Sequence, residues 1–285
     1  MQPRAKNLIL DLLSTVGRSA VPVRSLVAAG RLFGLADNGV RVALARLLAD
    51  GIVDRDERGL YHLGPGARAV NARIRSWRHL DELMQPWSGD WIGVQTAGLA
   101  RGSARTQRRR ERALRLLGFR PFARGLELRP DNLAAGVEGL RAQLVDLGLD
   151  AAALVCRVSA LVPDDDRRAR KLWDADALRA GYAASREQLR ASAEALAEQP
   201  RGEAMVESFV TGGEAIRRLV LDPLLPEPIV PAAERRALVD AVLRYDRLGR
   251  TLWAGWSGAG TTDQFPADIR GLEAAGDLLR AAEGA

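Results

Sequence analysis

The chain has 285 residues, 47% of them hydrophobic and 27% charged, which is enough apolar material for two or three globular domains. The sole cysteine, Cys156, excludes an internal disulfide and any CxxC site, and two histidines leave little for a zinc site or an acid–base triad. No apolar run approaches the roughly 18 residues of a membrane helix, so we expect a cytoplasmic protein with no membrane partner. We also expect no metal and no cofactor.

The net charge of +6 is unevenly distributed along the chain. Residues 1–80 carry 13 basic and 6 acidic side chains, and residues 101–125 carry nine arginines and one glutamate. Residues 81–100 carry three acidic side chains and no basic one, and residues 126–285 are mildly acidic. This segregation indicates a polyanion-binding amino-terminal block on an otherwise near-neutral body.

The first 66 residues are predicted to form three helices followed by a β-hairpin. Apolar residues at helical spacing predict helices over residues 8–16, 23–33 and 39–50. Pro22 suits the start of the second helix, Asp37 or Asn38 can cap the third, and Gly51 ends it. Two short strands, 52–55 and 60–63, flank a turn at 56–59. This order predicts a winged helix-turn-helix DNA-binding domain over 1–66.

The rest of the chain is predicted to be a connecting helix at 67–86, a ferredoxin-like α+β domain at 87–166 and a helical C-terminal domain at 167–285. The fold class is therefore α+β. In the middle domain we expect strands at 91–96, 119–128 and 152–161, helices at 105–117 and 133–147, and a closing acidic loop at 164–166. In the last domain, which is the expected site of dimerisation and effector binding, we expect helices near 168–198, 204–221 and 231–253, then a loop at 255–264.

The third predicted helix carries the pattern that DNA recognition requires. Its outer face presents small and polar residues with an arginine at each edge, namely Asn38, Arg41, Val42, Ala45 and Arg46. Arginine reaches guanine or phosphate, asparagine reads adenine, and valine or alanine meets a thymine methyl. The alternative is a small helical domain with a solvated face. The hairpin that follows and the basic block favour DNA.

Two other charged segments have more than one interpretation. Arg55 and Arg58 in the hairpin turn either contact phosphates or the minor groove, or belong to an ordinary charged turn. Within Arg101 to Arg124, three arginines contact a nucleic-acid backbone, bind a ligand's phosphates or lie on a solvated amphipathic helix, namely Arg108, Arg109 and Arg112. Adjacent carboxylates at Asp164 to Asp166 are typical of a solvated loop and only rarely of a magnesium-dependent nuclease.

In the order of its motifs, the chain resembles the PaaX-type transcriptional repressors of phenylacetate degradation and their relatives. The similarity extends to about residue 255. It rests on Gly39 to Gly51, Arg58 to Leu63, Trp87 to Val94, Arg112 to Phe119, Leu172 to Asp174 and Arg217 to Pro226. The resemblance implies a homodimeric DNA-binding repressor that is released by an acyl-CoA thioester, phenylacetyl-CoA in the best-known case.

A CoA thioester carries several phosphates, so an effector of that class needs clustered arginines and an apolar or aromatic lining. The residues available for this are Arg108, Arg109, Arg112, Arg217, Arg218 and Trp173. Two departures from the family pattern concern this site: Pro231 to Arg236 replaces a proline and tryptophan-glycine element, and Glu214 to Ile216 lacks a histidine. If those elements shape the effector site, the effector differs.

We therefore expect a regulator of an aromatic-acid catabolic operon rather than an enzyme. One alternative is a metal-dependent nucleic-acid-processing enzyme that uses the middle domain. Another is a ligand-binding protein whose winged helix serves only as a protein–protein module.

Overall fold

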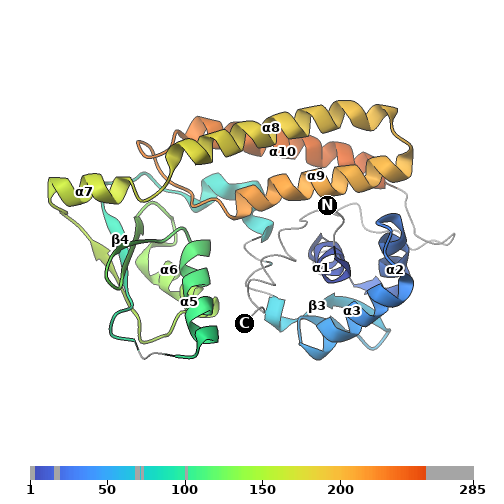
Figure 1. Cartoon of the computed structure of the whole chain (residues 1–285), viewed down its shortest axis with the longest axis horizontal. Helices are drawn as coiled ribbons and strands as arrows, with labels where there is room; N and C mark the ends of the chain where they lie inside the picture. The colour runs from blue at the N-terminus through green and yellow to red at the C-terminus, as the bar shows by residue number, and fades with distance from the viewer. Residues whose placement is uncertain (1–3, 16–19, 68–70, 72–73, 100–101, 255–285) are drawn as a thin grey trace. The chain divides into compact units, whose positions relative to one another are not determined.

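The computed structural model describes residues 4–15, 20–67, 71, 74–99 and 102–254 (Figure 1). It is a mixed α+β structure with a helical C-terminal region, as predicted. The loop expected at 255–264 lies outside the described residues. The described chain forms two compact units: unit 1 falls within Met1–Trp77, Ser185–Val220 and Val239–Arg280, and unit 2 within Arg78–Ala184 and Leu221–Leu238. The domain boundaries expected at 66, 86 and 166 stay predictions.

The amino-terminal part of unit 1 consists of three helices and a small antiparallel sheet with the strand order β1-β3-β2. Its elements are α1 (Ala5–Thr15), β1 (Val21–Pro22), α2 (Val23–Leu32), α3 (Asp37–Ala49), β2 (Val53–Arg55) and β3 (Leu60–Leu63). The apolar positions that predicted the helices form the core: Leu8, Ile9, Leu12, Leu13, Leu26, Val40, Leu44 and Leu47 are all buried. Only α3 buries a single apolar stripe; α1 is buried at every residue from 7 to 14 and α2 at every residue from 25 to 30, so both are enclosed on all sides.

Of two local predictions in this part, one is confirmed in part and one is wrong. Pro22 does stand at the start of α2, but as its extended N-cap residue with φ −71° and ψ 147°, paired with Leu60 in the short strand β1, and not within the first helical turn. The third helix begins at Asp37 and is preceded by Ala36, so neither Asp37 nor Asn38 caps it. Asp37 instead forms an ion pair with Arg31. The predicted end of the first helix, Val16 and Gly17, lies outside the described residues.

Unit 2 contains an antiparallel four-stranded sheet with the order β5-β6-β4-β7. Its elements are β4 (Trp91–Gln95), α5 (Ala104–Leu116), β5 (Arg120–Ala123), β6 (Leu126–Pro130), α6 (Gly136–Asp146) and β7 (Leu154–Val158). The single strand expected at 119–128 is therefore two strands. Gly125 adopts φ +72°, which glycine reaches without strain, and this turn reverses the chain between β5 and β6.

The segment before the sheet is less regular than the helix expected at 67–86. Residues 71, 74 and 75 are α-helical, in agreement with the expected helix, but the described part also contains the 3₁₀ helices η1 (Pro65–Ala67) and η2 (Ser76–Leu83). At His79 the backbone leaves helical geometry, with φ −128° and ψ 36°. Long 3₁₀ runs are uncommon because their hydrogen-bond geometry is poorer, which is consistent with this kink.

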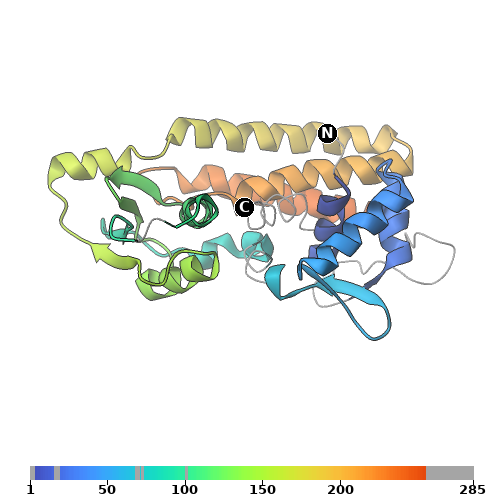
Figure 2. The ribbon, with the colours of Figure 1, turned by 60° about the horizontal axis from the view of Figure 1, so that its bottom comes forward.

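The remaining elements are helical: α7 (Pro163–Arg170), α8 (Ala175–Ala195), η3 (Leu196–Glu198), α9 (Arg201–Val220) and α10 (Ala232–Trp253). The acidic loop expected at 164–166 is instead the first turn of α7. Proline at the first position and acidic residues in the first turn both favour a helix start, because their charges and geometry match the helix N-terminus. Figures 1 and 2 both show α8, α9 and α10 running side by side.

Aromatic rings join α9 and α10 to the amino-terminal helices within unit 1. Phe209 on α9 meets the Phe33 ring edge-to-face at 5.0 Å and lies 5.9 Å from the ring of Trp253. The Trp253 Nε1 donates a hydrogen bond to the carbonyl of Met205 at 3.1 Å. A buried tryptophan N–H needs such a partner, so this contact fixes the ring in the core.

Candidate nucleic-acid interface

The outer face of α3 is exposed along its whole length. Val40, Leu44 and Leu47 are buried, because the helical repeat places them on one side. The five residues expected to read DNA all lie on the exposed part of the helix: Asn38, Arg41, Val42, Ala45 and Arg46. Val42 keeps 42% of its surface exposed. The face therefore offers an apolar contact between two cations.

The turn between α2 and α3 is fixed by a bidentate ion pair. Arg31 donates through Nε and Nη2 to the two carboxylate oxygens of Asp37, at 2.8 and 2.5 Å. The hydrogen bond from Arg31 holds the pKa of Asp37 below its usual value. At Gly30 an added Cβ would lie 2.6 Å from Cγ2 of Val40, so glycine lets the two helices approach closely. Both features fix the angle at which α3 presents its outer face.

The hairpin of β2 and β3 has a turn built around Asp56. Its Oδ1 accepts hydrogen bonds from the backbone N–H groups of Arg58 at 3.0 Å and Leu60 at 2.8 Å. Gly59 adopts φ +79°, the left-handed conformation that such turns require. Arg55 and Arg58 are both exposed, and the Arg55 guanidinium lies 5.8 Å from the centre of the Tyr61 ring. Asp56 therefore orders the turn from within instead of neutralising its arginines.

The four arginines of this surface form no ion pair with any carboxylate in the part of the chain that the structure describes; they are Arg41, Arg46, Arg55 and Arg58. Unpaired arginines keep their donors available for phosphate or for a base edge. α3 and the hairpin thus combine exposed, unpaired cations on a rigid support.

The residues predicted to bind an effector fall into both units. Arg108, Arg109 and Arg112 lie on α5 in unit 2, and the first two are exposed. Arg217 and Arg218 lie on α9 in unit 1, where Arg218 Nε donates to the Ser185 hydroxyl at 2.7 Å.

Trp173, the sixth of these residues, is buried inside unit 2. Its ring stacks on that of Trp91 with a centroid separation of 6.2 Å, and its Nε1 donates to the carbonyl of Gly118 at 3.1 Å. The ring therefore has core partners on its face and at its nitrogen.

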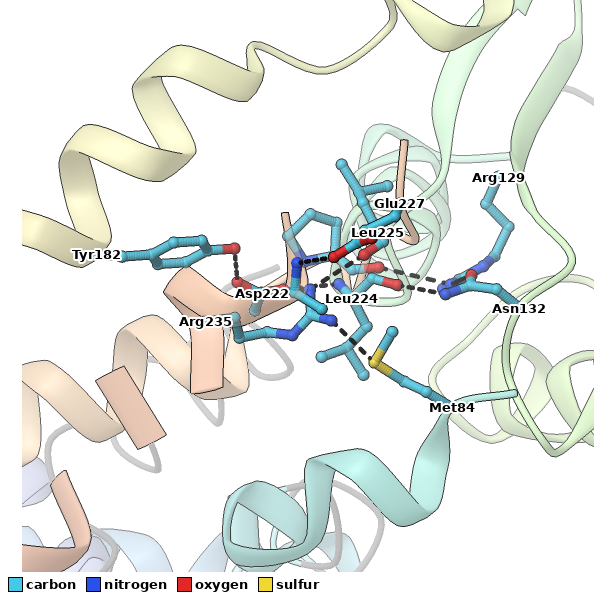
Figure 3. A network of polar contacts seen from close by, with 11 residues as sticks. Met84, Arg129, Asn132, Tyr182, Asp222, Leu224, Leu225, Glu227 and Arg235 are labelled. Carbon is cyan, nitrogen blue, oxygen red and sulfur yellow. Dashed lines mark hydrogen bonds and ion pairs between the residues drawn. The ribbon is translucent and has the colours of Figure 1, made fainter. Parts of the chain in front are cut away.

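Unit 2 also contains a buried polar network that the sequence pattern did not reveal (Figure 3). It is centred on Asp222, the first residue of the Asp222 to Pro226 motif. The Tyr182 hydroxyl donates to Asp222 Oδ2, and Arg235 Nη1 lies 3.8 Å from Asp222 Oδ1. Arg235 is only 2% exposed and also donates to the carbonyl of Leu225 at 3.1 Å. Burial, first of all, raises the pKa of the Tyr182 hydroxyl.

The same motif also contacts two residues at the end of β6 and just after it, Arg129 and Asn132. Asn132 donates to the carbonyl of Leu224 at 2.7 Å and accepts a hydrogen bond from Arg129 Nη2 at 3.0 Å. Leu224 adopts φ +52°, and its N–H is bound by Asp222 Oδ1 at 2.7 Å. A left-handed leucine is costly, so the polar contacts on both sides of it are what hold this conformation. The network has a structural role, since every cation in it is already paired with protein groups.

Two residues of this network lie in segments that the sequence pattern singles out. The Asp222 to Pro226 motif was one of the resemblances, and Arg235 lies in the Pro231 to Arg236 stretch that departs from the family pattern. The pairing itself was not predictable, because Asn132 and Leu224 are 92 residues apart.

The three aspartates at 164–166 each pair with an arginine one helical turn further along α7. Asp164 pairs with Arg167, Asp165 with Arg168 at 3.3 Å, and Asp166 with Arg170 at 2.7 Å. Across the described residues, no group of three or more histidine, cysteine, aspartate or glutamate side chains could hold a metal ion. The metal-dependent nuclease alternative is not favoured by this arrangement.

Comparisons with known proteins find a family match for the C-terminal part of the chain. Residues 173–246 match the family model of the PaaX-like protein C-terminal domain. The solved structure of the uncharacterized protein Rv0674 from Mycobacterium tuberculosis is similar over 87% of this chain and 98% of its own, with 22% sequence identity and a TM-score of 0.56, and so shares the fold. No curated protein matches the chain significantly.

No helix in the described ranges is both long and apolar enough to cross a membrane. The family match covers Tyr182, Asp222 and Arg235, so the buried network lies within the matched region. Residues 173–246 of the chain are thus similar to the C-terminal domain of PaaX-like proteins.

Proposed function

We propose that the chain is a DNA-binding transcriptional regulator whose amino-terminal part is a winged helix-turn-helix. Three helices followed by a hairpin, in a sheet of order β1-β3-β2, support this assignment. In unit 2, the order β-α-β-β-α-β with an antiparallel sheet supports a ferredoxin-like assignment. In this proposal α3 enters the major groove and the turn of the hairpin contacts the backbone.

The observation that carries the proposal is the exposed outer face of α3. Small side chains allow close approach to the bases, and Arg41 and Arg46 are free to contact guanine or phosphate. The match of residues 173–246 to the PaaX-like C-terminal domain supports the regulatory role, because the PaaX-type proteins that the chain resembles are transcriptional repressors. We assign the chain no catalytic activity and expect it to act on DNA in the cytoplasm.

The finer parts of the proposal follow the family resemblance. The chain acts as a homodimeric repressor of an aromatic-acid catabolic operon and is released by an aryl-acyl-CoA effector, of which phenylacetyl-CoA is the best-known example. Two copies double the number of contacts on an inverted-repeat site, which a single winged helix needs in order to reach useful affinity. Sedimentation in the micromolar range, with and without DNA, tests the dimer.

A gel-shift experiment on the DNA upstream of the protein's own gene tests the DNA-binding role. The wild type should retard this duplex in preference to a scrambled one, and Arg41→Ala/Arg46→Ala should lose that preference. The matched control is Arg244→Ala/Arg247→Ala, which removes two exposed arginines from α10 and the same net charge. Equal retardation by the wild type and the α3 variant would contradict the assignment. Binding to neither duplex would favour a protein–protein role for this domain.

A further inference from the structure

Helix α5 carries a dense row of arginines on its solvent side. Its 13 residues include six arginines and a single glutamate. Ala113, Leu114 and Leu116 are buried, so the opposite face is turned to solvent. That face and its margins hold Arg105, Arg108, Arg109, Arg112 and Arg115, of which only Arg112 is half-buried. Because one turn of helix rises about 5.4 Å, the row presents a cation at each of three successive turns.

The positive charge of this row is not neutralised by the protein. None of the five arginines forms an ion pair within the described residues, and Nη1 of Arg112 is buried without a hydrogen-bond partner. Burial lowers the pKa of Arg112, and the neighbouring charges of Arg115 and Arg108 lower it further. On β5, burial and Arg115 likewise lower the pKa of Arg120. These cations repel one another, so an external anion would relieve an unfavourable local field.

The shape of this face favours an extended anion over a compact one. Small ligands bind in concave sites that cover most of their surface. The α5 row instead lies on the outer, convex side of a helix, where regularly spaced guanidinium groups can each meet one phosphate of a polymer. Trp173 cannot line a ligand site beside this row in this conformation, because its ring is buried against Trp91.

We propose that α5 is a second DNA-binding surface, whose arginines bind backbone phosphates of duplex DNA in addition to the contacts made by α3. The inference rests on the proposed DNA-binding function and gives Arg108, Arg109 and Arg112 a role in DNA binding instead of effector binding. Contacts of this kind carry no sequence information, so α5 strengthens binding to every duplex alike.

The test is the salt dependence of binding to the upstream duplex and to a scrambled duplex. The variant Arg108→Gln/Arg112→Gln/Arg115→Gln removes three cations from the row. The plot of log affinity against log salt concentration should become shallower by about 2 to 3, since each phosphate contact contributes about 0.9 to its slope. Affinity should fall roughly tenfold or more for both duplexes, with the preference for the upstream duplex retained.

Two control variants separate phosphate contact from a general change in charge or fold. Arg236→Gln/Arg244→Gln/Arg247→Gln removes the same charge from exposed positions of α10 and should leave the slope as in the wild type. The variant with lysine at all three α5 positions keeps the charge and should retain most of the slope. Circular dichroism and thermal unfolding should show all variants folded, because these arginines make no stabilising ion pair.

The outcomes distinguish this inference from the proposed function. If the α5 variant keeps wild-type slope and affinity while Arg41→Ala/Arg46→Ala loses binding, α5 does not contact DNA and the regulator assignment stands. If the wild type binds no duplex, the proposed function fails and this inference fails with it. If the α5 variant binds DNA normally but loses calorimetric binding of phenylacetyl-CoA, the row belongs to an effector site and the inference is wrong.

Discussion

Helices α5 and α7 lie in the same unit and are both rich in arginine, but their charges are arranged in opposite ways. Each of the three arginines of α7 that follow its aspartates has a carboxylate partner on the same helix. The six arginines of α5 share a helix with one glutamate and form no ion pair within the described residues. Arginine content alone therefore does not identify an anion-binding surface. The two helices differ in whether a carboxylate of the protein already pairs with each arginine.

The same distinction sorts the other arginines of the chain. On α3, Arg41 and Arg46 resemble those of α5, being exposed and unpaired. In unit 2, Arg129 and Arg235 are buried and fully engaged with backbone and side-chain acceptors. We expect paired buried arginines to affect stability, unpaired exposed ones to affect DNA binding, and paired exposed ones to affect neither strongly. Four predictions test this, beginning with the largest effect.

Substitution of Arg235 should cost the most stability. Arg235→Met removes the cation that lies 3.8 Å from the buried Asp222 carboxylate, and removing one partner of a buried pair typically costs about 3–5 kcal/mol. Urea unfolding followed by circular dichroism measures this loss. The adjacent Arg236→Met provides the control, because Arg236 is exposed and should change stability by less than about 0.5 kcal/mol. Similar losses for both variants would show that the network does not depend on Arg235.

The α3 arginines should show the reverse pattern, with an effect on binding and none on stability. If Arg41 or Arg46 reads a base, its replacement by alanine should cost about 1–3 kcal/mol on the cognate duplex and relax the sequence preference at one position. If it binds a phosphate, the replacement should weaken binding to all duplexes alike. Fluorescence anisotropy on a panel of single-base variants separates the two. The groove assignment is wrong if both variants bind as tightly as the wild type.

The α3 surface could be predicted from the sequence because it depends on local spacing. The helical repeat alone separates buried Val40, Leu44 and Leu47 from exposed Arg41 and Arg46. The hairpin was predictable for the same reason, since a turn with Asp56 and Gly59 separates two short apolar runs.

The features that sequence reasoning missed depend on long-range or competing contacts. Strand β1 is only two residues long and exists through its pairing with Tyr61 and Leu60 on β3. A buried arginine is unexpected until its acceptors are known, and those of Arg129 include the carbonyl of Pro223, 94 residues away. At α7, the run of aspartates taken alone predicts a loop, whereas the arginines of the next turn pair with it and favour a helix.

The ion pair between Arg31 and Asp37 allows the contribution of a paired, exposed arginine to be tested by changing the pH. Its hydrogen bond lowers the pKa of Asp37 below the usual value of about 3.9. The pair therefore stabilises the fold above about pH 4, and this contribution is lost as the pH falls through the lowered pKa of the folded state. In an NMR titration, Arg31→Gln should return the pKa of Asp37 toward its usual value. Arg41→Gln should raise it much less, because Arg41 contributes only a weaker Coulomb attraction.

The smallest effect is expected on α7. Arg167→Gln and Arg168→Gln each break an exposed ion pair between neighbouring turns, and such pairs contribute about 0.5 kcal/mol or less to stability. Arg168→Gln also removes the contact between its guanidinium and the Phe122 ring, 4.1 Å from the ring centre, which adds about 0.5–1 kcal/mol. DNA affinity should also stay within about twofold of the wild type, since these charges are already neutralised by Asp164 and Asp165. Glutamine at Arg108 and Arg115 of α5 removes the same charge and should leave stability equal or higher, because it relieves repulsion, while weakening DNA binding. If the α7 double variant weakens DNA binding as much as the α5 double variant does, net charge and not pairing determines where the polyanion binds.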